Sequence, residues 1–245
     1  MTPASVPNAP GAADTLAVDV VPELEALGAR ALVTRRDAGT FSTASDEPIS
    51  VVMGRWDALA RMLGVRDGRL ATSRQIHGAR ILRHEAGWTG WLRAGDADGH
   101  HAPARGTAMA ISVADCVPVF LVHASGAAAL LHAGWRGTAA GILEHGLSAL
   151  AADGIRPAEV TVYLGPAICG ACYEVGPEVI RAITGRQGAG PERLDLRGEL
   201  ARRAHAAGAR EIITSPFCTR CDNDRYFSHR AGDRGRQVAA LVVPA

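Results

Sequence analysis

The stretch Thr107–Gly137 limits the possible folds more than any other part of the chain. It contains three continuous apolar runs, and runs of this length bounded by turn residues are typical of strands buried on both faces. The runs cover residues 108–113, 117–122 and 127–131. Asp115, Cys116 and His132 interrupt or follow them, and such polar groups are costly inside a core unless they are paired or bound. The stretch therefore predicts a buried sheet with a functional site at its strand ends.

The rest of the chain predicts one α/β unit around this sheet. Its 245 residues can bury one large core, and strands and helices alternate unevenly, which predicts a mixed sheet with helices outside it. Further strands are predicted at residues 29–34, 70–75, 80–83, 160–164, 211–214 and 238–243. Helices are predicted at residues 56–63, 138–151, 177–183 and 194–207. We expect residues 1–15 to form a flexible leader, residues 16–245 a single domain, and residues 88–106 a surface loop.

Charge and composition exclude several classes of partner. The formal net charge is +1 and no block of Lys or Arg is present, so the sequence marks no nucleic-acid or membrane surface. No apolar run approaches the ~20 residues of a membrane span, and the N-terminal region lacks the basic and apolar segments of a secretory signal. Five cysteines in a chain too large to need disulfides favour reduced thiols. These features predict a cytoplasmic protein.

Cys116 and His132 follow neighbouring predicted strands, sixteen positions apart. Two chemistries fit this pair. His132 could deprotonate Cys116 for nucleophilic attack, or both could bind a transition metal, with an open position left for water. His77, which lies between two short extended segments and beside Gly78, is then the best third ligand. The alternative without function is a structural Cys and a hydrogen-bonded core His, because these residues form no compact ligand motif.

Other polar residues near this pair suggest accessory roles. Asp98 and Asp115 could orient a ligand imidazole or transfer a proton, although Asp115 could also cap a turn. Arginine in turns is suited to bidentate binding of phosphate or carboxylate, and the alternative is a solvated face. The turn arginines are Arg35, Arg36, Arg55, Arg136, Arg230 and Arg236. Arg136 is the strongest of them because it follows Trp135 in a Gly-flanked turn beside His132.

Two C-x-x-C pairs, Cys169/Cys172 and Cys218/Cys221, stand outside this group. Four thiols could make a structural zinc site. The gap between the pairs is however far longer than in zinc ribbons, so independent reduced thiols are the default interpretation. A thioredoxin-like redox role is weaker still, because neither pair opens a helix after a strand with the usual flanks. The sequence alone leaves the structural metal open.

Several motifs together resemble the laccase-domain family, whose members are also called polyphenol oxidases or purine nucleoside phosphorylases of the laccase-domain type. The motifs occur in family order from about Thr34 to the end of the chain, and the block H-A-G-W-R-G is highly specific. They are Q-I-H-G, A-D-C-V-P-V, H-A-G-W-R-G, L-G-P-A-I-x-x-x-x-Y-E-V and C-T-x-x-x-x-x-x-Y-F-S-H-R.

The resemblance implies an α-β-β-α sandwich with mixed β-sheets, similar in core to the catalytic domain of cytotoxic necrotising factor and present as a monomer or weak homodimer. It implies a zinc ion held by His77, Cys116 and His132, the trio reached above. The implied activities are phosphorolysis of adenosine, inosine and methylthioadenosine, and deamination of adenosine, with nucleoside and phosphate as partners. Copper-dependent oxidation of phenols and a role in the fidelity of peptidoglycan precursor synthesis are also attributed to the family.

Within that activity each polar residue has an expected role. Arg136 would neutralise charge at a cationic-sugar transition state, and Asp98 or Asp115 would manage the purine proton. In deamination, a water molecule activated by zinc would attack the purine C6. The substrate- and phosphate-binding set is completed by Arg36, Arg55, Trp135 and Arg230.

The chain departs from the family pattern at three places. Gly54 stands where an Asn often precedes the Arg, and Ala231 stands where a second Arg commonly follows. The family's usual D-A-x-x-T reads here Asp98-Gly99-His100-His101, without the Thr. These changes lie around the expected pocket more than at the metal trio. They put the substrate preference in doubt rather than the chemistry.

Three other functions are weighed against the nucleoside enzyme. Multicopper oxidation needs His-x-His pairs and a His-Cys-His run, and the nine His of this chain form neither. Because His84, His145 and His205 are also expected to be exposed, phenol oxidation would come only from adventitious copper in the trio. A metal-free hydrolase or amidase using Cys116 and His132 would suit a peptidoglycan role. A non-catalytic division or envelope partner is the third alternative.

Overall fold

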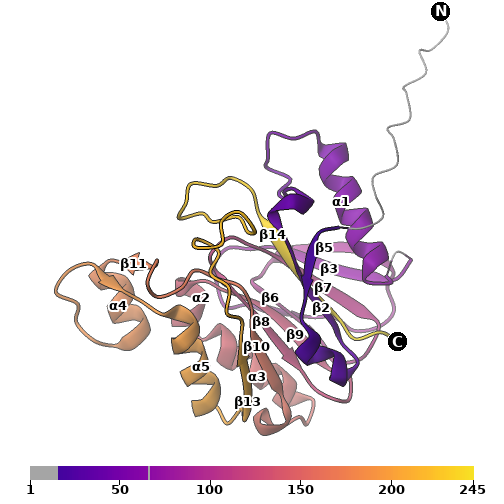
Figure 1. The fold of residues 1–245 in the computed structure, drawn as a ribbon. Coiled ribbons are helices and arrows are strands. Elements are labelled where there is room, and N and C mark those ends of the chain that lie inside the picture. Colours follow the sequence, from indigo (N-terminus) through magenta and orange to yellow (C-terminus); the bar gives the residue numbers. More distant parts are fainter. Residues whose placement is uncertain (1–15, 66) are drawn as a thin grey trace, which may run out of the picture.

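The structure, a computed structural model, describes residues 16–65 and 67–245. Two six-stranded mixed sheets form its centre (Figure 1). The first has the order β1-β2-β14-β7-β3-β5, with bounds Val18–Val20, Arg30–Thr34, Gln237–Val242, Thr107–Val113, Arg69–Arg74 and Gly90–Asp96. The second has the order β13-β10-β8-β9-β6-β4, with bounds Glu211–Thr214, Thr161–Leu164, Val117–Val122, Ala128–Ala133, Gly99–Ala102 and Ile81–Arg83. The expected leader at residues 1–15 lies outside the described residues.

The apolar runs of the sequence become the central strands of the two sheets. Successive side chains of a strand point to opposite faces, so β7 sends Met109 and Ile111 toward Phe120 and Leu130 between the sheets. Its alternate residues, such as Ala110, pack on the outer side. Because β7 and β8 belong to different sheets, the short turn between them crosses from one layer to the other.

Helices cover the outer face of each sheet. Trp56 and Leu59 of α1 (Ile49–Met62) pack on the first sheet. Leu143 and Leu147 of α3 (Ile142–Ala152) pack on the second, together with α4 (Pro177–Thr184) and α5 (Leu196–Ala206). The predicted α-β-β-α sandwich with mixed sheets is therefore confirmed. Its likeness to cytotoxic necrotising factor stays a prediction.

The predicted surface loop at residues 88–106 is wrong, since it contains β5 and the fully buried β6. β6 was not predicted from the sequence because its buried side chains are largely polar and form no apolar run. His100 Nδ1 lies 2.9 Å from His84 Nε2, and His101 Nε2 lies 3.0 Å from a carboxylate oxygen of Asp153. The expectation that His84 is exposed is therefore also wrong.

The helix predicted at residues 138–151 is in fact two helices, α2 (Trp135–Ala139) and α3. Gly141 separates them with a φ of +81°, a backbone conformation that favours glycine. The remaining regular pieces are a small pair of strands, β11 (Glu174–Val175) and β12 (Glu192–Arg193), and three 3-10 turns. Among the described residues, no helix has both the length and the apolar character to cross a membrane.

Candidate metal centre

His77, Cys116 and His132 come together at the ends of strands from both sheets. His77 follows β3, Cys116 precedes β8 in the turn that crosses between the sheets, and His132 lies near the end of β9. One donor atom from each of the three lies within 4.8 Å of the other two. The rings of His77 and His132 meet edge to face, with centroids 4.9 Å apart. The three segments therefore converge on one point.

The buried carboxylate of Asp98 holds two of these ligands in place. Its Oδ1 accepts a hydrogen bond from the Nδ1 of His132 at 2.8 Å and from the backbone N–H of His77 at 2.9 Å. Its Oδ2 accepts from the N–H groups of Ile76 and Gly78, at 3.1 and 2.7 Å. Burial opposes ionisation, but these bonds and the charge of His132 outweigh it and lower the pKa of Asp98. With Nδ1 engaged by Asp98, Nε2 is the nitrogen of His132 that would bind a metal.

Gln75, which sequence reasoning did not single out, also anchors the loop of His77. Its side-chain amide donates to the carbonyl of Ser112 at 2.8 Å and accepts from the N–H of Ser112 at 2.8 Å, so it mimics a strand pairing with β7. His77 itself has a φ of +60°, which is uncommon for a residue with a Cβ. The bonds through Gln75 and Asp98 stabilise this conformation. The Q of the Q-I-H motif could have signalled this role.

Two glycines of the H-A-G-W-R-G block make room for the centre. A Cβ on Gly134 would lie 3.0 Å from the Sγ of Cys116 and 3.2 Å from the Cδ2 of His77. A Cβ on Gly137 would lie 2.7 Å from the carbonyl oxygen of Gly78. Neither position accepts a side chain without moving a ligand or the loop that carries one. The two glycines of the motif therefore leave room for the metal ligands, and its His132 supplies one of those ligands.

Cys116 and His132 change each other's ionisation. Burial opposes the thiolate, but the charge on His132 and hydrogen bonds from both imidazoles lower the pKa of Cys116 to about 6. Burial likewise opposes the imidazolium, but the thiolate and Asp98 raise the pKa of His132 to about 9. At neutral pH the thiol is therefore ready to bind a metal or to act as a nucleophile.

The donor set fits a borderline-soft transition metal. One thiolate and two imidazoles suit zinc or copper, and the small Gly134 leaves the space beside them free. His77 is exposed, Cys116 half-buried and His132 buried, so one side of the centre faces solvent. Three protein ligands with an open fourth position are typical of catalytic metal sites.

Asp115, a predicted proton-transfer group, has both carboxylate oxygens in hydrogen bonds within the protein. Its Oδ1 accepts from the hydroxyl of Thr219 at 2.6 Å and its Oδ2 from the backbone N–H of Arg230 at 2.7 Å. Its φ of +84° is strained for a residue with a Cβ. Both carboxylate oxygens therefore tie the turn before Cys116 to two later loops. The geometry supports the turn-capping interpretation more than proton transfer.

Two arginines, each stacked on an aromatic ring, belong to segments that adjoin the trio, since Arg136 follows His132 by four residues and the backbone N–H of Arg230 donates to Asp115. Burial and the negative charge of Cys116 raise the pKa of the Tyr173 phenol to about 12, while Arg230 and Arg136 oppose that shift. The guanidinium of Arg230 lies 5.2 Å from the centre of the Tyr173 ring, and that of Arg136 lies 4.4 Å from the centre of the Trp135 ring. Both arginines are exposed, and the guanidinium of Arg230 also donates to the carbonyl of Glu174 at 2.8 Å. Exposed guanidinium groups of this kind are suited to binding an anion.

Arg36 and Arg55, two other predicted phosphate ligands, have partners of their own. Arg36 pairs with Asp233 at 2.5 Å and lies over the ring of Phe227. Arg55 pairs with Glu47 at 2.6 Å and donates to the carbonyl of Thr40 at 2.9 Å. Both guanidinium groups hold surface loops in this structure. Their predicted contact with phosphate would need these pairs to open.

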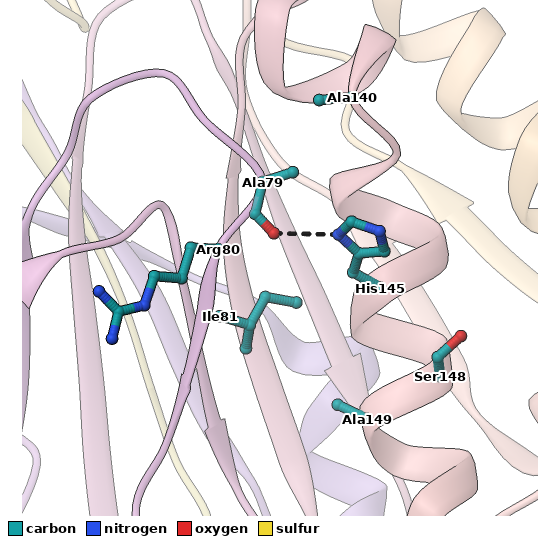
Figure 2. Close-up of a pocket in the computed structure, with 7 residues that line it drawn as sticks. All are labelled: Ala79, Arg80, Ile81, Ala140, His145, Ser148 and Ala149. Carbon is teal, nitrogen blue, oxygen red and sulfur yellow. Dashed lines mark hydrogen bonds between the residues drawn. The ribbon is translucent and has the colours of Figure 1, made fainter.

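Two hollows lie outside the trio. Figure 2 shows an open one of about 720 Å³ between the segment of β4 and α3, where the Nδ1 of His145 lies 3.1 Å from the carbonyl oxygen of Ala79. A second hollow of about 490 Å³ is bordered by Trp56, Trp91 and Gln75. Neither is lined by His77, Cys116 or His132.

A four-layer sandwich with a thiolate and two imidazoles converging at its strand ends defines the class of this protein. A family model described as multi-copper polyphenol oxidoreductase laccase matches residues 37–244, so the chain belongs to that family.

Two similar proteins are named for reactions of nucleosides. A purine nucleoside phosphorylase of Streptomyces coelicolor is 35% identical over 206 residues, covering 80% of this chain and 84% of its own length. An adenosine deaminase from an unknown prokaryotic organism is 31% identical over 209 residues, covering 76% of this chain and 78% of its own length.

Solved structures share the fold. The hypothetical protein YfiH of Bacillus licheniformis superposes with a TM-score of 0.85 at 23% identity, covering 94% of this chain and 97% of its own. YlmD of Geobacillus stearothermophilus gives a TM-score of 0.80 at 26% identity, covering 89% and 93%. The chain is therefore similar in fold to each of these proteins along nearly its whole length.

Proposed function

We propose that this protein is a zinc-dependent purine nucleoside enzyme that phosphorolyses adenosine, inosine and methylthioadenosine and deaminates adenosine. The observation that carries the proposal is the convergence of His77, Cys116 and His132 within 4.8 Å, with one side facing solvent. The names of the relatives from Streptomyces coelicolor and the unknown prokaryote supply the substrate class. Cytoplasmic location and a monomeric or weakly dimeric state stay predictions.

The protein's own groups divide the work. His77, Cys116 and His132 would hold the ion, which supplies Lewis-acid activation when bound. Asp98 keeps the proton of His132 on Nδ1 and fixes the loop of His77. Arg136 is exposed and stacks on Trp135, four residues after His132, and its guanidinium would hold phosphate and stabilise charge that develops in the transition state.

Adenosine incubated with phosphate tests this proposal directly. We expect chromatography to show adenine and a phosphorylated ribose from phosphorolysis, and inosine from deamination. Removal of metal with a chelator should abolish both products, and added zinc should restore them. Product formation that persists in protein shown by elemental analysis to be metal-free would contradict the metal-dependent mechanism.

The same trio also explains the copper association of the family name. A thiolate and two imidazoles bind copper readily, so copper added in vitro should support some oxidation of phenols. Among the described residues, the one other cluster of metal-ligand type contains four cysteines and no imidazole. We therefore propose that oxidation is adventitious, because a trinuclear copper cluster needs many imidazoles.

A metal-free hydrolase or amidase is the second candidate, and one observation favours it. Asp98, His132 and Cys116 form a continuous line from carboxylate to imidazole to thiol, the arrangement by which a base activates a nucleophile. Such an enzyme could act in editing of peptidoglycan precursors. The two candidates differ in whether the Cys116 thiolate is free.

Alkylation with iodoacetamide separates the two candidates. We expect Cys116 of the protein as purified to resist modification, because donation of electron density to the metal lowers the nucleophilicity of the sulfur. Chelator treatment should then expose it to rapid alkylation, since the pKa of its thiol is about 6. Peptide mass mapping locates the modified residue. Equal reaction of Cys116 with and without chelator would favour the metal-free enzyme.

A further inference from the structure

Four cysteines converge outside the centre described above. The Sγ atoms of Cys169, Cys172, Cys218 and Cys221 all lie within 4.8 Å of one another. The long gap between the two C-x-x-C pairs, which made independent thiols the default interpretation of the sequence, is closed by the fold. Independent thiols give no reason for such a convergence.

The sheet topology explains why the two pairs meet. β10 and β13 are parallel neighbours, with Leu164 opposite Thr214, so both strands leave the sheet at the same edge. The pairing continues beyond the strands, where Ala167 bridges to Cys218 in parallel. Each C-x-x-C pair begins within five residues of the end of its strand. Two loops far apart in sequence are thereby placed side by side.

The local hydrogen bonds are those of a thiolate site. The Sγ of Cys218 accepts from the backbone N–H of Cys169 at 3.3 Å and from that of Cys221 at 3.4 Å. The N–H of Cys172 donates to the carbonyl of Cys169 at 3.0 Å, which closes the first pair into a tight turn. Backbone N–H groups directed at sulfur stabilise its negative charge. Such bonds are expected around a sulfur that binds a cation.

We propose that these four cysteines bind a structural zinc ion, separate from the ion of the trio. Tetrahedral zinc holds each sulfur at about 2.3 Å, which separates the sulfurs by about 3.8 Å, and the Sγ atoms of Cys172 and Cys221 are 3.5 Å apart. Four sulfur ligands leave no open position, so the ion would be structural.

The proposed ion would clamp the two loops that support the turn of Cys116. Thr219, between the cysteines of the second pair, donates to Asp115, and the N–H of Ile168, beside the first pair, donates to the carbonyl of Asp115. Fixing both loops therefore fixes the turn at Asp115, which carries the Cys116 thiol. The existence of this site does not depend on the proposed nucleoside activity.

Zinc content of the full chain with Cys116→Ala tests the proposal. This variant lacks the thiolate of the trio and keeps only the four clustered cysteines, so we expect it to retain about one zinc per chain. Adding Cys221→Ser should remove that zinc, and adding Cys221→His instead should retain it, because imidazole replaces sulfur as a ligand. Cys221 is exposed, which makes both substitutions compatible with folding. Ala171→Ser, in the exposed centre of the first turn, is the control and should leave zinc unchanged.

Three results would overturn the proposal. They are a Cys116→Ala protein without zinc, a Cys221→Ser protein with the zinc of its parent, and an intact mass that shows disulfides in the unreduced chain. If a variant fails to fold, titration of the wild-type thiols with a mercurial replaces it. That titration should release one zinc ion more per chain from wild type than from Cys221→Ser alone, whatever ion the trio holds, and equal release from the two proteins would contradict the proposal. A loss of adenosine turnover with both ions present would instead count against the proposed function alone.

Discussion

Replacing Cys116 with Ala is expected to remove the ion of the trio and to lower adenosine turnover more than ~100-fold. Loss of a partner that merely orients a ligand costs about 10- to 100-fold in metal affinity or activity, and Cys116 supplies the one thiolate among the three donors. The alanine removes that ligand and leaves the Nε2 of His132 without its neighbour. Elemental analysis and product chromatography on the same protein preparation measure both effects.

A histidine pair provides the matched control for that result. His77→Ala removes an exposed ligand and should reproduce the loss, whereas His205→Ala removes an exposed imidazole on α5 and should change neither metal content nor turnover. A Cys116→Ala protein that kept its full metal content would show that the trio does not bind the ion. Turnover that survived complete loss of that ion would remove the basis for metal-assisted chemistry.

Strand positions could be predicted where the chain is apolar on both faces. The runs that became β7, β8 and β9 carried that signal, because each of these strands is buried between two layers. β6 carried none, since it buries His100 and His101 in polar contacts supplied by distant residues. A single sequence does not show such contacts, so its composition indicated a loop.

The candidate ligands could be named from sequence, but their geometry could not. The positions of Cys116 and His132 followed from polar residues beside apolar runs, and motifs supported His77. That Asp98 holds all three N–H groups of the Ile76–Gly78 loop depends on a strand that was not predicted. The convergence of the two C-x-x-C pairs likewise depends on the parallel pairing of β10 with β13. The spacing of the cysteines along the chain does not indicate that β10 and β13 pair.

Asp98→Asn is expected to weaken metal binding by about 10- to 100-fold and to destabilise the fold by about 3 kcal/mol. Every group that faces this carboxylate is a donor: two backbone N–H groups at Oδ2, and the N–H of His77 with the Nδ1 of His132 at Oδ1. An amide has one oxygen, so in either orientation its NH₂ meets donors. With the NH₂ toward His132, the ring must accept at Nδ1 and carry its proton on Nε2, where the metal would bind.

Asp153→Asn is the control, because one carboxylate oxygen of Asp153 also lies 3.0 Å from the Nε2 of a buried histidine, His101, while the other accepts from Arg83 at 2.6 Å, away from the trio. Chelator competition should show weaker zinc binding in the Asp98 variant alone. Thermal unfolding with excess chelator should show that the Asp98 variant is also less stable without metal, because the lost bonds include those to the loop of His77. Equal zinc affinity in Asp98→Asn and wild type would mean that the carboxylate only stabilises the fold. Weaker binding with an unchanged apo stability would instead assign it wholly to the orientation of His132.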